Sequence, residues 1–220
     1  DAMAAVANPL RMSLAEFLDW DDGTDTLYEL VEGRIVAMAP PNDAHGTIIM
    51  NIGLAIGPAL KAPCRIVGNA GIVLPERDDR YYVADLAVTC DQPASQRRFL
   101  PEPRLIVEVL SRSTAAHDRG LKGEDYRQLA SVQEILFVSN DERRVVRLRR
   151  EVDHWAIDDF IGDASVRLVS IDATMSLSTI YANVAFGEPS TPAPDSGSEG
   201  RQQRRRKPAT ARRSRPRAKP

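Results

Sequence analysis

The sequence predicts an α/β protein with a mixed β-sheet core and flanking helices. Two strongly apolar, β-branched runs, at 81–90 and 104–110, have the composition of strands that are covered on both faces. A third run of this kind, at 134–140, follows a helical segment, so strand, helix and strand form a βαβ crossover. From Glu188 onward large apolar side chains almost vanish, which predicts a disordered basic tail.

The N-terminal half supplies shorter elements. Residues 1–12 read as a flexible leader, and the spacing of Ser13 and Glu16 is that of a capping box, which predicts a short helix. Two strands then meet at Glu32–Gly33, a dipeptide suited to a tight hairpin. A helix with apolar residues at helical spacing follows at 47–57. Asn42 or Asp43 can cap it, and Pro58 should end or kink it.

The remaining elements complete the sheet. Residues 65–74 form a strand with two glycines as expected bulges, and it pairs with the run at 81–90. Residues 143–150, 154–160 and 165–170 alternate in polarity, which predicts a closing antiparallel set. A short helix at 175–184 ends the domain. We therefore expect a leader at 1–12, one domain at 13–187 and a tail at 188–220.

The charge of the chain is unevenly distributed. Of 29 Lys and Arg, ten lie in 188–220, which leaves 19 in 1–187 against 28 Asp and Glu, a net charge of -9. An acidic body does not indicate a nucleic-acid binder by its bulk charge. The tail has two readings, a solubilising extension or a tether that neutralises phosphates. The tether would use Arg204, Arg205, Arg206, Lys207, Arg212 and Arg213.

Cysteine usage and hydropathy suggest a compartment. Cys64 and Cys90 form no disulfide framework and no metal-binding pair, so we expect two free thiols in a reducing cytosol. The longest apolar region, 47–60, is too short to span a bilayer. A cytoplasmic location is therefore expected.

The apolar runs each carry one carboxylate, Asp85 in the first and Glu108 in the second. An ionised carboxylate in such a setting is costly unless it is paired, hydrogen-bonded or bound to a metal. The helix that follows presents Asp118, Lys122 and Tyr126 on one face. Two acids on adjacent strands with a lysine nearby suit a divalent metal and an activated water.

An ordered set of motifs carries a resemblance over residues 13–186. The segments YELVEGRIVAMAPPNDAHG, YYVADLAV, LIVEVLSRST and D-x-x-x-K-x-x-x-Y together resemble the Uma family of bacterial proteins. That family is related to the PD-(D/E)XK restriction-endonuclease-like nucleases, so the resemblance implies a restriction-endonuclease-like fold. It implies less about activity, because fold does not determine function.

The resemblance also implies roles for particular residues. Asp85 is the motif aspartate, although Ala84 stands where the family pattern has proline, and Glu108 is the acid of the E-x-K element. Since the third position of that element is a leucine, the helix residue Lys122 supplies the cation. Val109 offers its backbone carbonyl to the metal, beside the carboxylates of Asp85 and Glu108.

Two further residues and the partners follow from the same likeness. Glu29 and His45 are second-tier candidates to stand in for the first-helix acid of the nuclease superfamily, which has no clear counterpart here. Mg²⁺, or Mn²⁺, is the implied cofactor, and DNA is the implied substrate, with RNA also compatible. Nucleases that cut both strands often pair, so a homodimer is compatible as well. The general base is left open between Lys122, solvent hydroxide and the substrate.

Each assignment has a plainer alternative. Asp85 and Glu108 could be buried acids held by arginines such as Arg65 or Arg104, and Lys122 could be an exposed residue paired with the aspartate four positions earlier. The whole chain could be a catalytically silent nuclease-fold module that binds nucleic acid or a protein. No Ser-His-Asp arrangement, P-loop or GxGxxG occurs. With only three histidines in the chain, we do not expect a zinc site.

Overall fold

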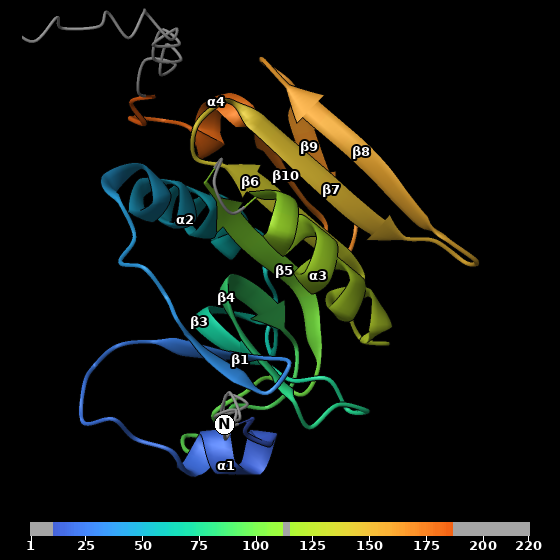
Figure 1. Ribbon diagram of the computed structural model, residues 1–220. Coiled ribbons are helices and arrows are strands. Elements are labelled where there is room, and N and C mark those ends of the chain that lie inside the picture. The colour runs from blue at the N-terminus through green and yellow to red at the C-terminus, as the bar shows by residue number, and fades with distance from the viewer. Residues whose placement is uncertain (1–10, 112–114, 187–220) are drawn as a thin grey trace, which may run out of the picture. The chain divides into compact units, whose positions relative to one another are not determined.

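The computed structural model describes residues 11–111 and 115–186 (Figure 1). The chain separates into two units, Asp1–Gly187 and Glu188–Pro220, and every described residue lies in the first. The predicted tail at 188–220 and most of the predicted leader lie outside the described residues. Met12 donates its backbone N–H to the carbonyl oxygen of Gly33 over 2.8 Å, so the described chain begins on the first hairpin.

The described residues form an eight-stranded mixed sheet with helices against it, which confirms the predicted fold class. Along the sheet the strands are β2 (Arg34–Ala37), β1 (Tyr28–Val31), β4 (Arg80–Thr89), β5 (Pro103–Leu110), β6 (Glu134–Ser139), β7 (Arg144–Arg150) and β8 (Trp155–Ile161), with β3 (Arg65–Ile72) paired to β4. β5 and β6 are parallel and joined by α3 (Ala115–Gln128), the predicted crossover, while the other pairs are antiparallel. This places the two apolar runs with their acids in adjacent strands.

The N-terminal elements begin and end where their residues predict. α1 (Leu14–Asp19) has the full capping box, in which Ser13 and Glu16 satisfy each other's backbone N–H groups. The β1–β2 hairpin turns at Glu32 and Gly33, whose φ angles of 53° and 75° are those of a tight turn of the primed type. The hairpin therefore continues the twist of its strands.

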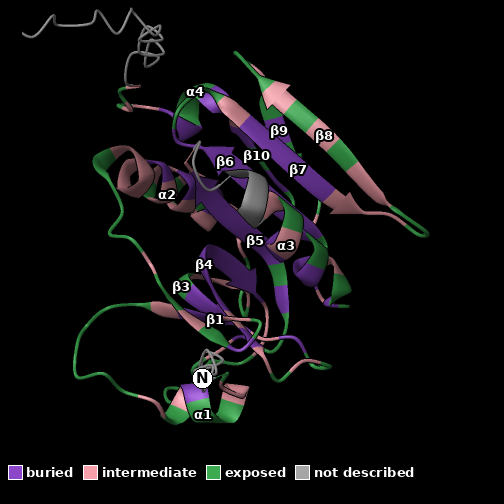
Figure 2. Ribbon diagram, viewed as in Figure 1, coloured by how far each residue is buried: buried purple, intermediate pink, exposed green. Residues whose placement is uncertain are grey.

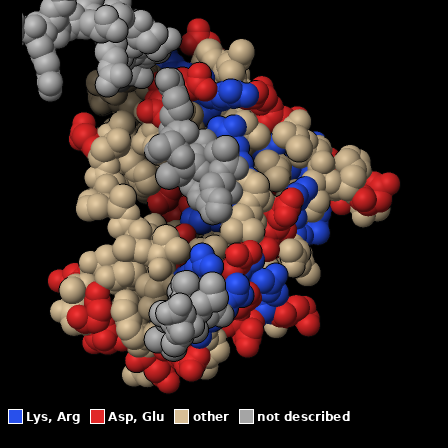
Figure 3. Space-filling model, in the orientation of Figure 1, with Lys and Arg blue, Asp and Glu red and all other residues tan. Residues whose placement is uncertain are grey.

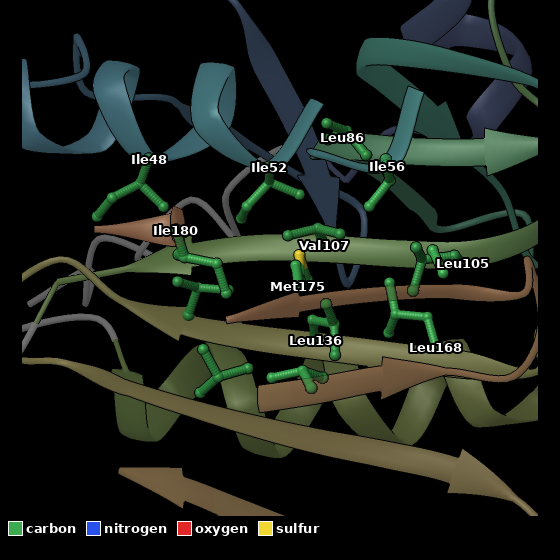
Figure 4. Packing of buried hydrophobic residues seen from close by; sticks show 14 of the residues in the cluster. Ile48, Ile52, Ile56, Leu86, Leu105, Val107, Leu136, Leu168, Met175 and Ile180 are labelled. Carbon is green, nitrogen blue, oxygen red and sulfur yellow. The ribbon is translucent and has the colours of Figure 1, made fainter. Parts of the chain in front are cut away.

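One hydrophobic core lies between the sheet and α2 (Asp43–Ile56) (Figure 4). Ile48, Ile52 and Ile56, four residues apart, point from the helix onto β4 and β5 and are fully buried. The side chain of Asn42 caps this helix by accepting the backbone N–H of His45, and the short 3-10 helix η1 (Gly57–Ala59), with its proline, ends it. The predicted helix and its stop are both found.

A second core lies on the opposite face of the sheet, under α3. Alternate residues of β5 divide between the two cores, Val107 facing α2 and Ile106 facing α3. Figure 2 shows β5, β6 and most of β7 buried, whereas β8 at the sheet edge is mixed. The central strands are thus covered on both sides, as their composition predicts.

β4 departs from simple alternation at Asp85. Ala84 packs in the α3 core, and Leu86, two residues later, packs in the α2 core, although regular alternation would keep them on one face. The partner strand is irregular at the facing position, where Asn69 has a φ of 47°. Asparagine tolerates this left-handed conformation better than most residues. The sequence predicted bulges at the glycines of β3, and the conformational irregularity lies at Asn69.

The C-terminal part differs from the prediction in its pairing. Instead of joining β8, β9 (Ser165–Leu168) pairs with β10 (Ala173–Ser176) in a separate two-stranded sheet. Both strands put apolar residues into the α2 core. The predicted terminal helix is shorter, because its first residues belong to β10 and only α4 (Leu177–Ile180) is helical.

The prediction of two free thiols is wrong in this structure, since Cys64 and Cys90 form a disulfide. The reason lies in the β3–β4 register: Arg65 pairs with Thr89, so the next residue on each side stands opposite the other. The inference of a reducing compartment from free thiols therefore loses its basis. None of the described helices is both long enough and apolar enough to cross a membrane.

Candidate active site

The predicted acids lie just beyond the end of the β4–β5 ladder. The last paired residues there are Leu86 and Val107, and the next residue on each strand is Asp85 or Glu108. Past this point β4 and β5 no longer exchange backbone hydrogen bonds. Side chains occupy the opening instead, so two buried carboxylates stand where the sheet ladder has stopped.

Asp85 is fixed by one backbone and one side-chain contact. Its Oδ2 accepts the backbone N–H of Val109 over 2.7 Å, and its Oδ1 lies 3.1 Å from Nε2 of His45. His45 is in the first turn of α2, which the Asn42 cap holds in place. The second-tier candidate His45 is therefore brought directly to the predicted aspartate.

Glu108 faces the other side of the sheet, toward α3. Its Oε1 accepts the hydroxyl of Tyr126 over 2.6 Å and lies 3.4 Å from Nζ of Lys122. The residue is only 3% exposed. This burial raises the pKa of the Glu108 carboxyl to about 7, an effect that Lys122 opposes and that the negative charge of Asp85 strengthens.

Lys122 is bound between two acids. Its Nζ donates to Oε1 of Glu29 over 2.8 Å as well as facing Glu108, and it lies 5.7 Å from the ring centre of Tyr82. Glu29 also accepts the backbone N–H of Val83 over 2.9 Å. Lys122 is 8% exposed, so the alternative of a solvated surface lysine is wrong. The side chain of Asp118, its proposed partner, lies outside the described residues.

A second buried network holds α3 against β4 behind the lysine. Asp125 accepts a hydrogen bond from Nε of Arg80 over 3.1 Å and another from the hydroxyl of Tyr82. Because these groups come from the strand and from the helix turn next to Lys122, they fix the helix that presents the ammonium. The sequence analysis did not find this network, since Arg80 and Asp125 look like ordinary surface charges in the sequence.

The alternative in which arginines neutralise the two acids is not found among the described residues. Arg65 donates instead to the backbone carbonyl of Asp91, and no ion pair joins Arg104 to either acid. The partners of the two carboxylates are a histidine, a lysine, a tyrosine and a backbone amide.

A cleft of about 740 Å³ opens at Asp85 and His45. Its walls come from the segment before β1, the connection from β2 to α2, the first turns of α2 and the irregular part of β3. Asn69, opposite Asp85 on the partner strand, also lines it. Asp85 is thus the acid that a ligand in the cleft would meet, whereas Glu108 is not part of the lining.

The family is decided by a match over most of the chain. Residues 14–178 match the family described as "Uma2: Putative restriction endonuclease". The chain belongs to the Uma2 family. The predicted resemblance is therefore confirmed, together with the restriction-endonuclease-like fold that it implied.

Relatives of this Uma2 chain support the same conclusion. The Synechocystis proteins slr1290 and sll1609, both described as uncharacterized, are 28% and 25% identical over 179 and 169 residues. The matches cover 80% and 73% of this chain and 94% of each relative. A crystal structure described as a "putative nuclease belonging to DUF820" from Anabaena variabilis superposes with a TM-score of 0.61 at 20% identity. It covers 77% of this chain and 97% of its own, which supports the fold.

The donor set for a divalent cation in this Uma2 chain is small. Among the described residues, no group of three or more His, Cys, Asp and Glu side chains is arranged to hold a metal ion. Asp85 and Glu108 provide two carboxylates. The carbonyl of Leu110 accepts the backbone N–H of Asn140, so alternation along the strand turns the carbonyl of Val109 toward β4, where it would be the third oxygen donor. Mg²⁺ is commonly held by one or two carboxylates and completed by water and substrate phosphate, so this set fits Mg²⁺.

Proposed function

We propose that this Uma2 protein is a Mg²⁺-dependent endonuclease-like phosphodiesterase that acts on DNA. The observation that carries the proposal is the buried carboxylate of Glu108, which lies beside Asp85 and within 3.4 Å of Nζ of Lys122 at the end of the sheet ladder. A carboxyl with so high a pKa and a cationic neighbour is typical of a functional site. The family and fold are those of restriction-endonuclease-like proteins.

The roles of the residues follow from their contacts. Asp85, Glu108 and the carbonyl of Val109 would hold the cation. When bound, Mg²⁺ supplies positive charge at the scissile phosphate and lowers the pKa of water. Lys122 would stabilise the negative charge that develops on the phosphate oxygens. Glu29 keeps the ammonium in place, as its carboxylate is bonded to both Lys122 and the β4 backbone.

Two side chains orient the carboxylates. Tyr126 donates to Glu108, and burial raises the pKa of this tyrosine well above its ordinary value, so it acts as a fixed donor and carries no negative charge. His45 holds Asp85 from the side of the cleft.

A cleavage assay tests the proposal. Supercoiled DNA, linear duplex, single-stranded DNA and RNA are incubated with and without Mg²⁺ or Mn²⁺. Glu108→Gln is expected to lower the metal-dependent rate about 10²-fold or more, because one of two carboxylate ligands is lost. Glu124→Gln, an exposed glutamate on the same helix as Lys122, is the matched control and should retain the wild-type rate. Equal rates for the Glu108 variant and the control would refute the site.

One observation favours a second function, a catalytically silent module that binds nucleic acid or a protein. Both carboxylates already have protein partners, and no third side-chain ligand is gathered around them in the described part of the chain. Calorimetry separates the two functions. The enzyme requires Mg²⁺ or Mn²⁺ binding that Asp85→Asn weakens, whereas the silent module binds neither ion.

The basic tail is proposed as a tether for DNA. Arg204–Arg206 and Lys207 begin the basic run, which lies outside the described residues. Removing 188–220 is expected to weaken DNA binding and to flatten its dependence on salt, because fewer phosphates are neutralised. An unchanged salt slope in a binding titration would assign the tail another role.

A further inference from the structure

A second cavity, of about 290 Å³, lies beside the cleft and has aromatic walls. The rings of Trp20 and Tyr28 meet edge to face with their centroids 4.9 Å apart, and the ring centroids of Phe17 and Tyr81 are 5.2 Å apart. The cavity is smaller than the sites of most drug-sized ligands, so it suits a single planar ring system. We call this cavity the aromatic pocket. The sequence analysis predicted α1 as a short helix and did not predict this pocket.

The aromatic pocket is continuous with the cleft at Asp85. Thr26, Leu27 and Asn69 line both cavities. On β4 the pocket contains Val83 and the cleft contains Asp85, two residues later, a separation of about 7 Å along the strand. A ligand with one part in the pocket therefore has its next part at the candidate active site.

Two exposed acidic residues contribute to the lining of the aromatic pocket. Asp21 and Asp22 line it, and residues 12–33 contain no Lys or Arg. Figure 3 shows acidic side chains gathered at the end of the molecule where α1 lies. These carboxylates repel phosphate. Asp21 already accepts the backbone N–H of Gly23, and Asp22 accepts hydrogen bonds from Tyr28 and Thr24, so their remaining lone pairs can accept hydrogen bonds from the amino groups of adenine, cytosine or guanine. The ring that enters the pocket is therefore a base and the phosphates stay outside.

Arg98 supplies positive charge at the rim. Its backbone carbonyl accepts the hydroxyl of Tyr81 over 2.8 Å, directly above Gly71, where any larger side chain would collide with both groups. The Arg98 side chain is exposed and forms no ion pair within the described residues, whereas its neighbour Arg97 is paired with Asp91. Arg98 is thus free to contact a phosphate at the mouth of the pocket.

We propose that the aromatic pocket binds one unpaired base of the nucleic-acid strand whose phosphate is cut at Asp85 and Glu108. The proposal rests on the proposed function and narrows its substrate to single-stranded, frayed or distorted nucleic acid. Stacking on aromatic side chains is how proteins hold unpaired bases, and it is tolerant of sequence. A base inside a regular duplex could not reach the pocket without leaving its stack.

The two tryptophans of the chain, Trp20 and Trp155, make the test direct. Trp20 lines the pocket, and Trp155 begins β8 at the far edge of the sheet, where Arg150 covers its ring. Trp155→Phe leaves Trp20 as the sole indole fluorophore, and Trp20→Phe leaves Trp155. With a single-stranded oligonucleotide and no added divalent metal, fluorescence should be quenched in Trp155→Phe and unchanged in Trp20→Phe.

Affinity supplies a second measurement. Trp20→Ala should weaken oligonucleotide binding about 5- to 150-fold, the range expected for stacking one base, while Trp20→Phe should retain most of it. Arg98→Ala should reduce the salt slope of binding by about 0.7, the value of one phosphate on a single strand. Arg97→Ala is the matched control and should leave the slope unchanged.

Three competitors decide between the outcomes. An abasic oligonucleotide keeps the phosphates without the bases, and equal quenching by it would overturn the base site. Equal quenching by blunt duplex would overturn the requirement for an unpaired base, and saturation by a mononucleotide at the same concentration would overturn the assignment to a strand. Quenching by Trp20 without any metal-dependent cleavage would refute the nuclease and keep the binding site. Metal-dependent cleavage without any change in Trp20 fluorescence would keep the nuclease and refute the base-binding pocket.

Discussion

Glu108 on β5 and Glu134 on β6 are buried glutamates in adjacent strands, 3% and 1% exposed, yet their surroundings differ. Glu134 lies 3.6 Å from Arg147 and accepts both the backbone N–H and the hydroxyl of Ser170. Glu108 shares its cation with another acid: Nζ of Lys122 lies 3.4 Å from Glu108 and makes a shorter hydrogen bond, of 2.8 Å, to Glu29. Burial alone therefore does not mark a functional acid. What differs is the neighbourhood: Glu134 accepts two hydrogen bonds from Ser170, whereas Glu108 has the negative charge of Asp85 nearby and shares its lysine with Glu29.

The largest effect is expected at the structural member of the pair. Glu134→Ala should lower the free energy of unfolding by about 3–5 kcal/mol, because it leaves Arg147 buried against the sheet with a partner lost. Urea denaturation measures this. Activity per folded molecule should persist, and a specific loss of cleavage would make Glu134 part of the site.

The cation beside Glu108 should matter for rate. Lys122→Met keeps the length of the side chain and removes its charge, so kcat is expected to fall about 10²- to 10³-fold with little change in KM. The comparison variant is Arg147→Met, which removes the cation of the Glu134 pair. It should affect stability and leave the rate of the folded fraction intact. A similar fall in kcat for both variants would show that the cation beside Glu108 has no special role in the reaction.

The pH dependence of stability should separate Glu108 from an exposed glutamate. Its pKa is raised from 4.5 to about 7, so between these values the folded protein keeps a proton that the unfolded chain releases. Stability of the wild type therefore falls as pH rises from 4.5 to 7. Glu108→Gln does not titrate and should be more stable than the wild type by on the order of 3 kcal/mol at pH 8, but not near pH 4.5. If the stability of the wild type and of Glu108→Gln changed with pH in the same way, the raised pKa of Glu108 would be contradicted. Glu124→Gln is the control and should follow the wild type.

The smallest effect is a thermal shift. If Mg²⁺ is held by Asp85 and Glu108, ten times its dissociation constant stabilises the fold by about 1.4 kcal/mol, a rise in Tm of roughly 3–6 °C at pH 8. Differential scanning fluorimetry should show the rise for the wild type and lose most of it for Glu108→Gln. A variant of Glu134, Glu134→Gln, should keep the rise. A rise in both variants would place the ion elsewhere.

The sequence predicted the parts of the site that lie on regular elements. Asp85 and Glu108 stand out because each interrupts a long apolar strand, and Lys122 follows from the helical period after the second strand. Their partners were less predictable. The bond from His45 to Asp85 depends on how α2 packs on the sheet, which no local pattern encodes.

The features that the sequence did not predict depend on irregular backbone or on which strands pair. The change of face between Ala84 and Leu86 coincides with the left-handed conformation of Asn69 on the partner strand, and no local pattern of helix or strand signals it. The disulfide depended on a register that a sequence cannot fix without the strand pairing. The pairing of β9 with β10 was missed because alternating polarity identifies a strand and not its partner.

The change of face along β4 gives a single ten-residue strand membership in two separate interiors. One half completes the layer beneath α2, and the other completes the layer beneath α3. Asp85 lies at the junction and belongs to neither hydrophobic core. Its side chain lines the cleft instead. A central strand can therefore present a polar side chain to the cleft while its neighbouring residues still fill both cores.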